Sequence, residues 1–380
     1  MSAALRAILA GAALAVAAPA IAHSAPDYGP RDDTERGLWQ QMDEYERELK
    51  NSSFIMTDPA LNAYVKGVLC KTVGAERCQN TRIYIMRTPH YNAMMAPNGM
   101  MVVWSGLLLR TRNEAELATV LGHEFAHFEK RHSIQLYRNI KSKTDAMTWI
   151  RALPGGFFAQ MGLMGSVMSF NREMERQADL VALDDLARSG YDPIAASEIW
   201  EQLRAEMDST AEGRRMRKTM DSMGDFFSSH PNSKDRMEYL RAAAIGKRAA
   251  GQTKGVESYR AALAPWWPML IDDQIKLNQF AETEFLLNSM ARGAWTADLL
   301  YARGELYRAR AKDGDFLKAV GFYKAAIAAD AALAESWRGL GLSQMRSGAK
   351  DEGKQSLKTY LVKRPDADDH GIISLMAHAK

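Results

Sequence analysis

Two histidines four residues apart, His123 and His127, with Glu124 directly after the first, constrain this chain more than any other feature of its sequence. The residues around them favour a helix, and Asn113 suits its N-cap, so we expect one long helix from about residue 113 to 143. Positions four apart share a helix face, so both imidazoles can bind one metal ion. The pattern predicts a catalytic zinc site with Glu124 as general base in peptide hydrolysis. A surface helix with two incidental histidines is the alternative.

A third ligand is expected from the helix spanning residues 171 to 189, where Glu175 and Asp179 stand four apart on one face. A catalytic zinc takes three protein ligands and keeps a fourth position open. We assign Glu175 as the ligand and Asp179 as the carboxylate that orients a ligand imidazole by accepting its hydrogen bond. The alternative is a solvated acidic helix face.

Other ligand arrangements fit the sequence poorly. His132 follows His123 by nine residues, which places it on the opposite face of a continuous helix, so it is not predicted to be a ligand. A metzincin site would require glycine and histidine where this chain has Lys130 and Ser133.

The first 22 residues have the pattern of a signal peptide, with Arg6, an apolar run over residues 7–18 and small residues up to Ala22. The apolar run is too short and too rich in alanine for a membrane-spanning helix. We therefore expect an exported chain. Its formal net charge of only +3 argues against a dedicated nucleic-acid binder.

The two cysteines, Cys70 and Cys78, lie close together in the sequence. In an exported chain they are expected to form a disulfide that joins the end of a helix over residues 58–73 to the start of a strand. Two buried thiols are the alternative, and neither cysteine is given a catalytic role.

A small sheet is expected ahead of the metal-binding helix, because residues 82–87 alternate in the manner of a strand and a second strand follows a Pro-Asn-Gly turn. We predict that this second strand is an edge strand that holds the substrate through main-chain hydrogen bonds. Its residues are Gly99, Met100, Met101, Val102, Val103 and Trp104. A hairpin that only packs against the helix is the alternative.

Two further segments bear on function. Residues 152–170 carry no charge, but Pro154 and several glycines disfavour a membrane span, so we expect a lid or a buried crossover, with a segment dipping into a membrane as the alternative. Residues 300–307 align with residues 337–344 at an offset of 37, close to the 34-residue tetratricopeptide period. Stacked repeats of this kind form a groove suited to a peptide or a partner protein. An ordinary helical domain is the alternative.

The stretches 123–127, 171–179 and 92–99 together resemble the gluzincin family of HtpX-like, Oma-like and CAAX prenyl proteases. The export signal and the helical tail are similar to its periplasmic BepA-like branch, which implies outer-membrane protein quality control. The resemblance implies one Zn²⁺ per chain. It extends to His230-Pro231 and Arg236, which resemble a histidine and an arginine that the family carries beyond the ligand helix. His230 could stabilise an oxyanion, occupy the open metal position or take no part in the chemistry.

These features predict a mainly α (α+β) protein. A signal peptide (1–22) precedes a metalloprotease domain with a small sheet (23–245) and an all-α repeat domain (246–380). The expected function is a periplasmic zinc endopeptidase acting on unfolded or misassembled outer-membrane proteins. The alternative is a chaperone or scaffold for outer-membrane assembly, with repeats that bind the assembly machinery and a mostly latent metal site.

Overall fold

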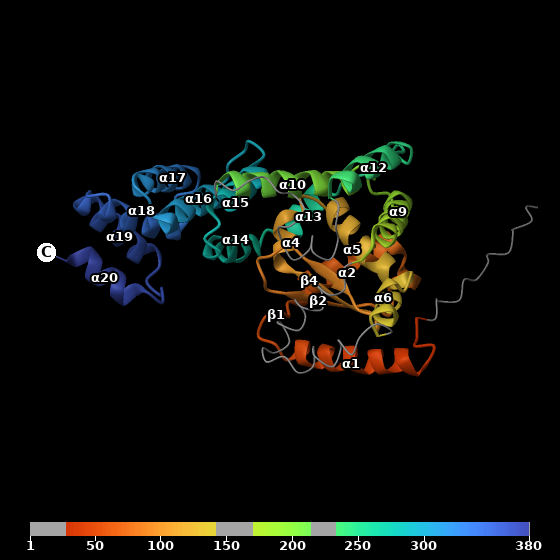
Figure 1. Cartoon of the computed structure of the whole chain (residues 1–380). Helices are drawn as coiled ribbons and strands as arrows, with labels where there is room; N and C mark the ends of the chain where they lie inside the picture. The colour runs from red at the N-terminus through yellow and green to blue at the C-terminus, as the bar shows by residue number, and fades with distance from the viewer. Residues whose placement is uncertain (1–27, 142–169, 214–232, 380) are drawn as a thin grey trace, which may run out of the picture.

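The computed structural model describes residues 28–141, 170–213 and 233–379. Helices dominate, with one small sheet in the first half of the chain and a trailing array of helices in the second (Figure 1). Three features of the sequence analysis lie outside the described residues. They are the expected signal peptide (1–22), residues 152–169 of the uncharged segment, and His230.

The sheet has four strands in the order β1-β2-β4-β3: β1 (Ile55–Met56), β2 (Arg82–Met86), β3 (Ala93–Met95) and β4 (Met100–Trp104). β2 and β4 are parallel, whereas β1 and β3 pair antiparallel with their neighbours. The prediction that Gly99 to Trp104 form an edge strand is therefore wrong. The turn at Gly99, whose φ of 86° suits glycine, brings β3 back along the outer side of β4. Both sides of β4 are paired, and β3 forms the edge.

Both faces of the sheet are covered, because successive residues of β4 point to opposite sides. Met100 and Val102 pack in one cluster with the apolar face of α1 (Asp33–Lys50). Met101 and Val103 belong to the larger core that includes α2 (Pro59–Val73) and α5 (Glu114–Glu129). Figure 1 shows α1 below the sheet, with α2 and α5 on its other side. The sheet is thus a buried layer on which the metal-binding helix rests.

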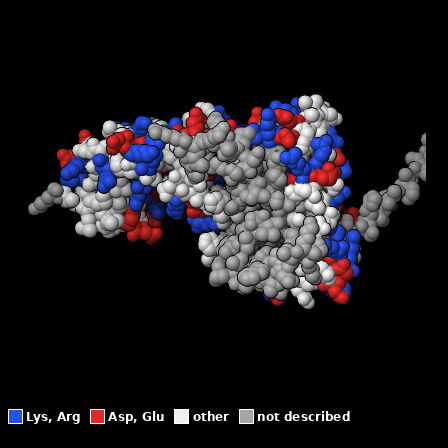
Figure 2. All heavy atoms as spheres, in the orientation of Figure 1, with Lys and Arg blue, Asp and Glu red and all other residues white. Residues whose placement is uncertain are grey.

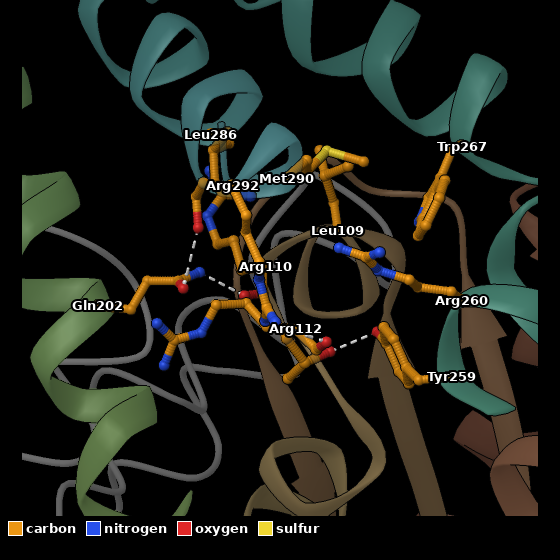
Figure 3. Close-up of a pocket in the computed structure, with 12 residues that line it drawn as sticks. Leu109, Arg110, Arg112, Gln202, Tyr259, Arg260, Trp267, Leu286, Met290 and Arg292 are labelled. Atoms are coloured by element: carbon orange, nitrogen blue, oxygen red, sulfur yellow. Dashed lines mark hydrogen bonds between the residues drawn. The ribbon is translucent and has the colours of Figure 1, made fainter. Parts of the chain in front are cut away.

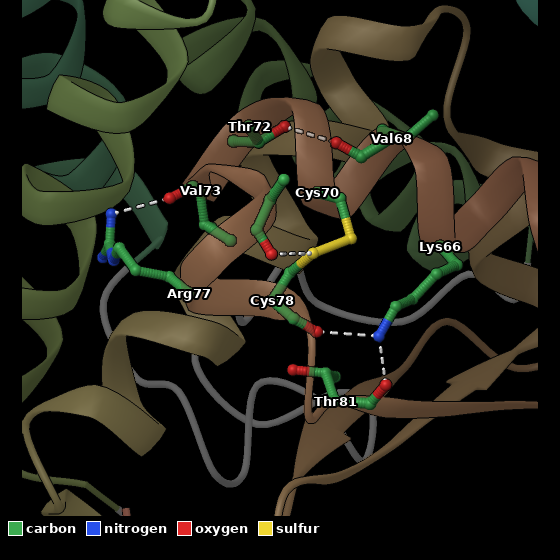
Figure 4. The surroundings of a disulfide bond; sticks show 9 residues. Lys66, Val68, Cys70, Thr72, Val73, Arg77, Cys78 and Thr81 are labelled. Atoms are coloured by element: carbon green, nitrogen blue, oxygen red, sulfur yellow. Dashed lines mark hydrogen bonds between the residues drawn. A yellow bond between two sulfur atoms is a disulfide. The ribbon is translucent and has the colours of Figure 1, made fainter. Parts of the chain in front are cut away.

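A disulfide joins Cys70 in α2 (Pro59–Val73) to Cys78 at the end of α3 (Ala75–Cys78), which confirms the predicted bridge (Figure 4). Between them the chain turns at Gly74, which has a φ of 95°. The ammonium group of Lys66 donates to the carbonyl oxygen of Cys78 at 2.7 Å. The bridge and this hydrogen bond fix the entry into β2.

The expected long helix is in fact two helices. α5 (Glu114–Glu129) begins at Asn113, whose side chain accepts from the Glu116 amide, and α6 (His132–Lys141) follows after a break. The break lies at Arg131, which has a φ of 57°. A left-handed residue cannot continue an α-helix, so the chain changes direction there. His132 is therefore not fixed on the far face of α5.

Four further helices of the described residues complete the region around the sheet, and an array follows. α4 (Ser105–Arg110) links β4 to α5, α9 (Arg172–Arg188) packs on α5, and α10 (Ala195–Gly213) packs on α12 (Ser233–Ile245). The remaining helices are α13 (Val256–Leu263), α14 (Trp267–Lys276), α15 (Phe280–Ala291), α16 (Ala297–Arg310), α17 (Asp315–Ala329), α18 (Ala334–Arg346), α19 (Lys350–Lys363) and α20 (His370–His378).

The pairs α16–α17 and α18–α19 are built alike. Gly304 packs on Tyr323 of α17, and Gly341 packs on Leu357 of α19, so close that a Cβ would come within 2.6 and 2.7 Å of those side chains. These glycines are the positions that the 37-residue offset aligns. None of the described helices combines the length and the hydropathy needed to cross a membrane.

At the seam between the sheet region and the array, polar groups from distant segments meet (Figure 3). Gln202 of α10 donates to the carbonyl oxygen of Arg110, and the Tyr259 hydroxyl lies 2.5 Å from the Thr111 hydroxyl. Arg110 itself is buried there between carboxylates from α10 and α15. The array is thereby joined to the segment that leads directly into α5.

Candidate metal centre

Three buried side chains meet where α5 and α9 cross. The Nε2 atoms of His123 and His127 lie 3.0 Å apart, and the Glu175 carboxylate lies 3.6 and 3.5 Å from them. One ligand atom from each residue falls within 4.8 Å of the other two. The structure thus brings together the three residues assigned as metal ligands.

Local sequence explains why these side chains face one another. α9 begins at Asn171, whose side-chain oxygen accepts from the amides of Glu173 and Met174. This cap sets Glu175 in the first turn and Asp179 one turn later, on the face toward α5. Where the helices meet, a Cβ on Gly122 would lie 3.6 Å from that of Ala182, an ordinary contact between small residues. Small side chains there allow the two helices to approach.

Asp179 supports His123 from behind. Its Oδ1 lies 2.9 Å from His123 Nδ1, which is the relation predicted from the sequence. It also accepts two hydrogen bonds from Arg236, at 2.6 and 2.8 Å, and one from the Tyr239 hydroxyl. Burial raises the pKa of Asp179, but the charge of Arg236 and the interaction with His123 outweigh it and hold the pKa well below its usual range. Asp179 is therefore a firmly ionised hydrogen-bond acceptor.

Arg236 joins the two carboxylates of α9. It reaches Glu175 at 2.8 Å as well as Asp179, and its guanidinium lies 3.9 Å from the centre of the Trp200 ring. Only 2% of Arg236 is exposed, so its charge is balanced inside the protein by these two acids. Arg236, which the family resemblance includes, thus lies against the ligand Glu175 and against Asp179.

His127 has a different partner. Its Nδ1 lies 3.0 Å from Nδ1 of His132, and His132 Nε2 lies 3.3 Å from the side-chain oxygen of Gln177. The ring of Phe170 stacks on His127 with centroids 3.9 Å apart. His132 was misplaced by the assumption of an unbroken helix, and nothing in the sequence indicates the turn at Arg131 that brings it here.

The donor set fits a divalent metal ion. Two imidazoles and one carboxylate, all buried, supply the ligand types that zinc and similar ions take in catalytic sites with an open position. The second nitrogen of each ring is engaged away from the centre, by Asp179 and by His132. Both Nε2 atoms are thereby oriented toward the same point. Glu124, 3% exposed, follows the first ligand on the same helix.

A helix that carries His-Glu-x-x-His, completed by a glutamate from a later helix, defines a metallopeptidase centre of the gluzincin type. Residues 56–244 match the model of peptidase family M48. Residues 56–244 therefore carry an M48 peptidase domain, the domain of a family of metalloproteases.

Several characterised proteins are similar over this region. The chain is 30% identical over 186 residues to the mitochondrial metalloendopeptidase OMA1 of Arabidopsis thaliana, which is 47% of this chain and 36% of that protein. It is 28% identical over 218 residues to the beta-barrel assembly-enhancing protease of Escherichia coli K12, which is 52% of this chain and 45% of that protein. With the human metalloendopeptidase OMA1 it shares 28% identity over 220 residues, covering 52% and 40%. The chain thus spans less than half the length of these relatives.

Proposed function

We propose that this chain is a zinc-dependent endopeptidase of the cell envelope that degrades unfolded or misassembled outer-membrane proteins. The observation that carries the proposal is the convergence of His123, His127 and Glu175, with Glu124 beside them. The expected signal peptide supports export to the periplasm. The name of the Escherichia coli relative, beta-barrel assembly-enhancing protease, supports the substrate class.

In this mechanism His123, His127 and Glu175 would hold the metal ion. The chemistry that bound zinc would supply is activation of water and polarisation of the scissile carbonyl. Glu124 accepts the proton of the attacking water and later delivers it to the amine that leaves. Asp179 keeps His123 in the tautomer that directs Nε2 to the metal, and Arg236 keeps Asp179 ionised.

The substrate is expected to pair with β3. This strand lies against α5 and pairs with β4 on one side only among the described strands. An extended peptide can add to such an edge through main-chain hydrogen bonds, which tolerate many sequences. The substrate-binding role predicted for β4 is therefore proposed for the neighbouring strand β3, Ala93 to Met95.

The array of helices after α13 is proposed to bind clients or the outer-membrane assembly machinery. Paired helices such as α16–α17 and α18–α19 stack side by side, which is how helical repeats build binding surfaces. If the metal site were mostly latent, the same surface would make the chain a chaperone or scaffold.

The decisive experiment is cleavage of an unfolded β-barrel polypeptide by the zinc-loaded chain. Glu124→Gln and a chelator serve as controls. We expect cleavage by the wild type and a loss of at least about 10²-fold with Glu124→Gln, because a positioned general base contributes on that scale. Stoichiometric zinc without any cleavage by the wild type would contradict the protease proposal and favour the scaffold.

A further inference from the structure

A cleft with aromatic walls lies at the end of α5, next to the metal site. Its larger part is a cavity of about 320 Å³ lined by Tyr28, Trp39, Pro97 and Phe128, among others. The same four residues line a smaller cavity of about 10 Å³ that reaches the ligand His127. Because the two cavities share these walls, they are adjoining parts of one space, which we call the aromatic cleft.

The walls of the aromatic cleft are held in place by specific contacts. The rings of Tyr28 and Phe128 lie 4.6 Å apart, and Arg131 lies 5.8 Å from the centre of the Trp39 ring. Arg131 also forms an ion pair with Glu35, which ties α1 to the end of α5. Tyr28 and Trp39 precede the residues that match the family model, which begins at residue 56. The cleft is therefore built in part by this chain's own N-terminal segment.

Charge in the aromatic cleft is balanced. Each arginine among its described lining residues has an acidic partner. The pairs are Arg77 with Glu129 and Asp185, Arg82 with Glu46, and Arg131 with Glu35. An added charge would find no unpaired counter-charge among these side chains, whereas an apolar group would contact aromatic rings. The aromatic walls thus favour a neutral, apolar group, while Asn80, Thr81 and Asn98 line the rest of the larger cavity.

The cleft also lies on the course that a substrate would take. Pro97 lies two residues after Met95, the last residue of β3, and β3 is the edge strand along α5. A peptide paired with β3 and extended past Ala96 would therefore reach Pro97, which lines both cavities of the aromatic cleft. About 320 Å³ lies within the size range of pockets that enclose a small ligand, so a large side chain can enter.

We infer that the aromatic cleft is a specificity subsite that takes a large apolar side chain, such as phenylalanine or leucine, from the peptide being cleaved. This inference rests on the proposed function, because it names the preference of the same active site. It assigns Trp39 and Tyr28 to substrate selection.

The test uses one peptide series in which a single residue near the scissile bond is Phe, Leu, Ala, Asp or Lys, with every position around the bond scanned in turn. The wild-type chain gives kcat/KM for each peptide. The Glu124→Gln chain gives the Kd for the same labelled peptides by fluorescence anisotropy. We expect one position at which Phe and Leu exceed Ala, Asp and Lys by about tenfold or more, the scale on which apolar pockets discriminate.

Two opposite changes in the cleft locate that preference. Trp39→Ala removes a wall. Asn80→Trp fills the space from an exposed lining position whose side chain forms no hydrogen bond or ion pair with the described residues. Both variants should bring the ratio of kcat/KM for the Phe peptide to kcat/KM for the Ala peptide close to one. Phe54→Ala, which removes an aromatic ring that is 50% exposed and does not line the cleft, should leave the ratio unchanged.

The outcomes separate this inference from the proposed function. If the wild type cleaves but the Phe/Ala ratio survives both Trp39→Ala and Asn80→Trp, the cleft is not the subsite. If the wild type cleaves nothing while Glu124→Gln binds Phe peptides about tenfold more tightly and loses this preference with Asn80→Trp, the subsite stands and the protease proposal fails. Equal Kd values for all peptides of the series, measured with the folded Glu124→Gln chain, would overturn the inference that the aromatic cleft is a subsite.

Discussion

Two buried arginines, Arg236 at the metal centre and Arg110 at the seam with the helical array, each face two carboxylates, yet the acids beside them behave differently. Arg236 lies between Glu175 and Asp179, and the pKa of Asp179 is held well below its usual range. The side chain of Arg110 is only 4% exposed, and next to it burial raises the pKa of Glu206 to about 7. An arginine partner alone therefore does not keep a buried acid ionised.

The number of donors explains the difference. Asp179 accepts from Arg236 twice and from Tyr239, and it faces His123 as well. Glu206 accepts one hydrogen bond from Arg110, at 2.7 Å, while a second nitrogen of that guanidinium serves Glu282 at 2.6 Å. The second oxygen of Glu206 has no hydrogen-bond partner among the described residues. Full satisfaction by donors is what makes a buried charge stable.

The largest effect is expected from Arg236→Met, measured by urea unfolding of the metal-free chain. The change leaves Glu175 and Asp179 buried without their cation, and breaking a buried pair in this way costs about 3–5 kcal/mol. Arg110→Met should cost less, because Glu206 can take up a proton. Arg241→Met, on the same helix as Arg236 but in an exposed pair with Glu201, should change stability by less than about 1 kcal/mol. Equal losses at Arg236 and Arg110 would contradict the comparison.

A pH-dependent effect is expected from Glu206→Gln. The folded-state pKa of Glu206, about 7, lies above its ordinary value of 4.5, so the folded state binds more protons between these values. The contribution of Glu206 to stability therefore falls as pH rises through this window. Removing the charge should stabilise the chain at pH 8 by about 1–3 kcal/mol and give little gain at pH 5.

Urea unfolding of Glu206→Gln at both pH values tests this expectation, with Glu44→Gln as the control for an exposed glutamate. A gain of the same size at pH 5 and pH 8 would show that Glu206 is not a strained anion in the folded state.

The sequence predicts the metal centre well because its geometry is local. His123 and His127 lie on one turn of one helix, and Glu175 and Asp179 on one turn of another, so periodicity alone aligns each pair. The fold class follows from similar patterns. The Arg110 cluster could not be found in this way, because its acids lie 96 and 172 residues further along the chain.

Two further misses have physical causes. β1 and β3 are two and three residues long, too short to show an alternating pattern, and without β3 the strand β4 looked like an edge. The break between α5 and α6 depends on the left-handed conformation of Arg131, a residue type that ordinarily continues a helix. His132 thus came to the metal centre through a turn that propensity does not predict.

The smallest effect is expected at the metal centre itself, where the two ligand histidines have different partners. The Asp179 carboxylate supports His123, whereas the neutral imidazole of His132 supports His127. With Nε2 of His127 directed at the metal, its Nδ1 carries the proton and donates to His132 Nδ1, and His132 Nε2 then donates to Gln177. His132→Phe keeps the ring but removes the acceptor. Metal affinity should fall about tenfold, the lower end of the range for such supporting residues.

His132→Asn tests whether the lost hydrogen bond is the cause, because the asparagine side-chain oxygen can stand where Nδ1 stood and accept from His127. It should recover most of the affinity, measured by competition with a chromogenic chelator, and the Co²⁺ absorption spectrum should return toward that of the wild type. His378→Phe, at an exposed histidine of α20, controls for the loss of an imidazole elsewhere. Equal affinities for the Phe and Asn variants would mean that His132 acts through packing rather than through its acceptor nitrogen.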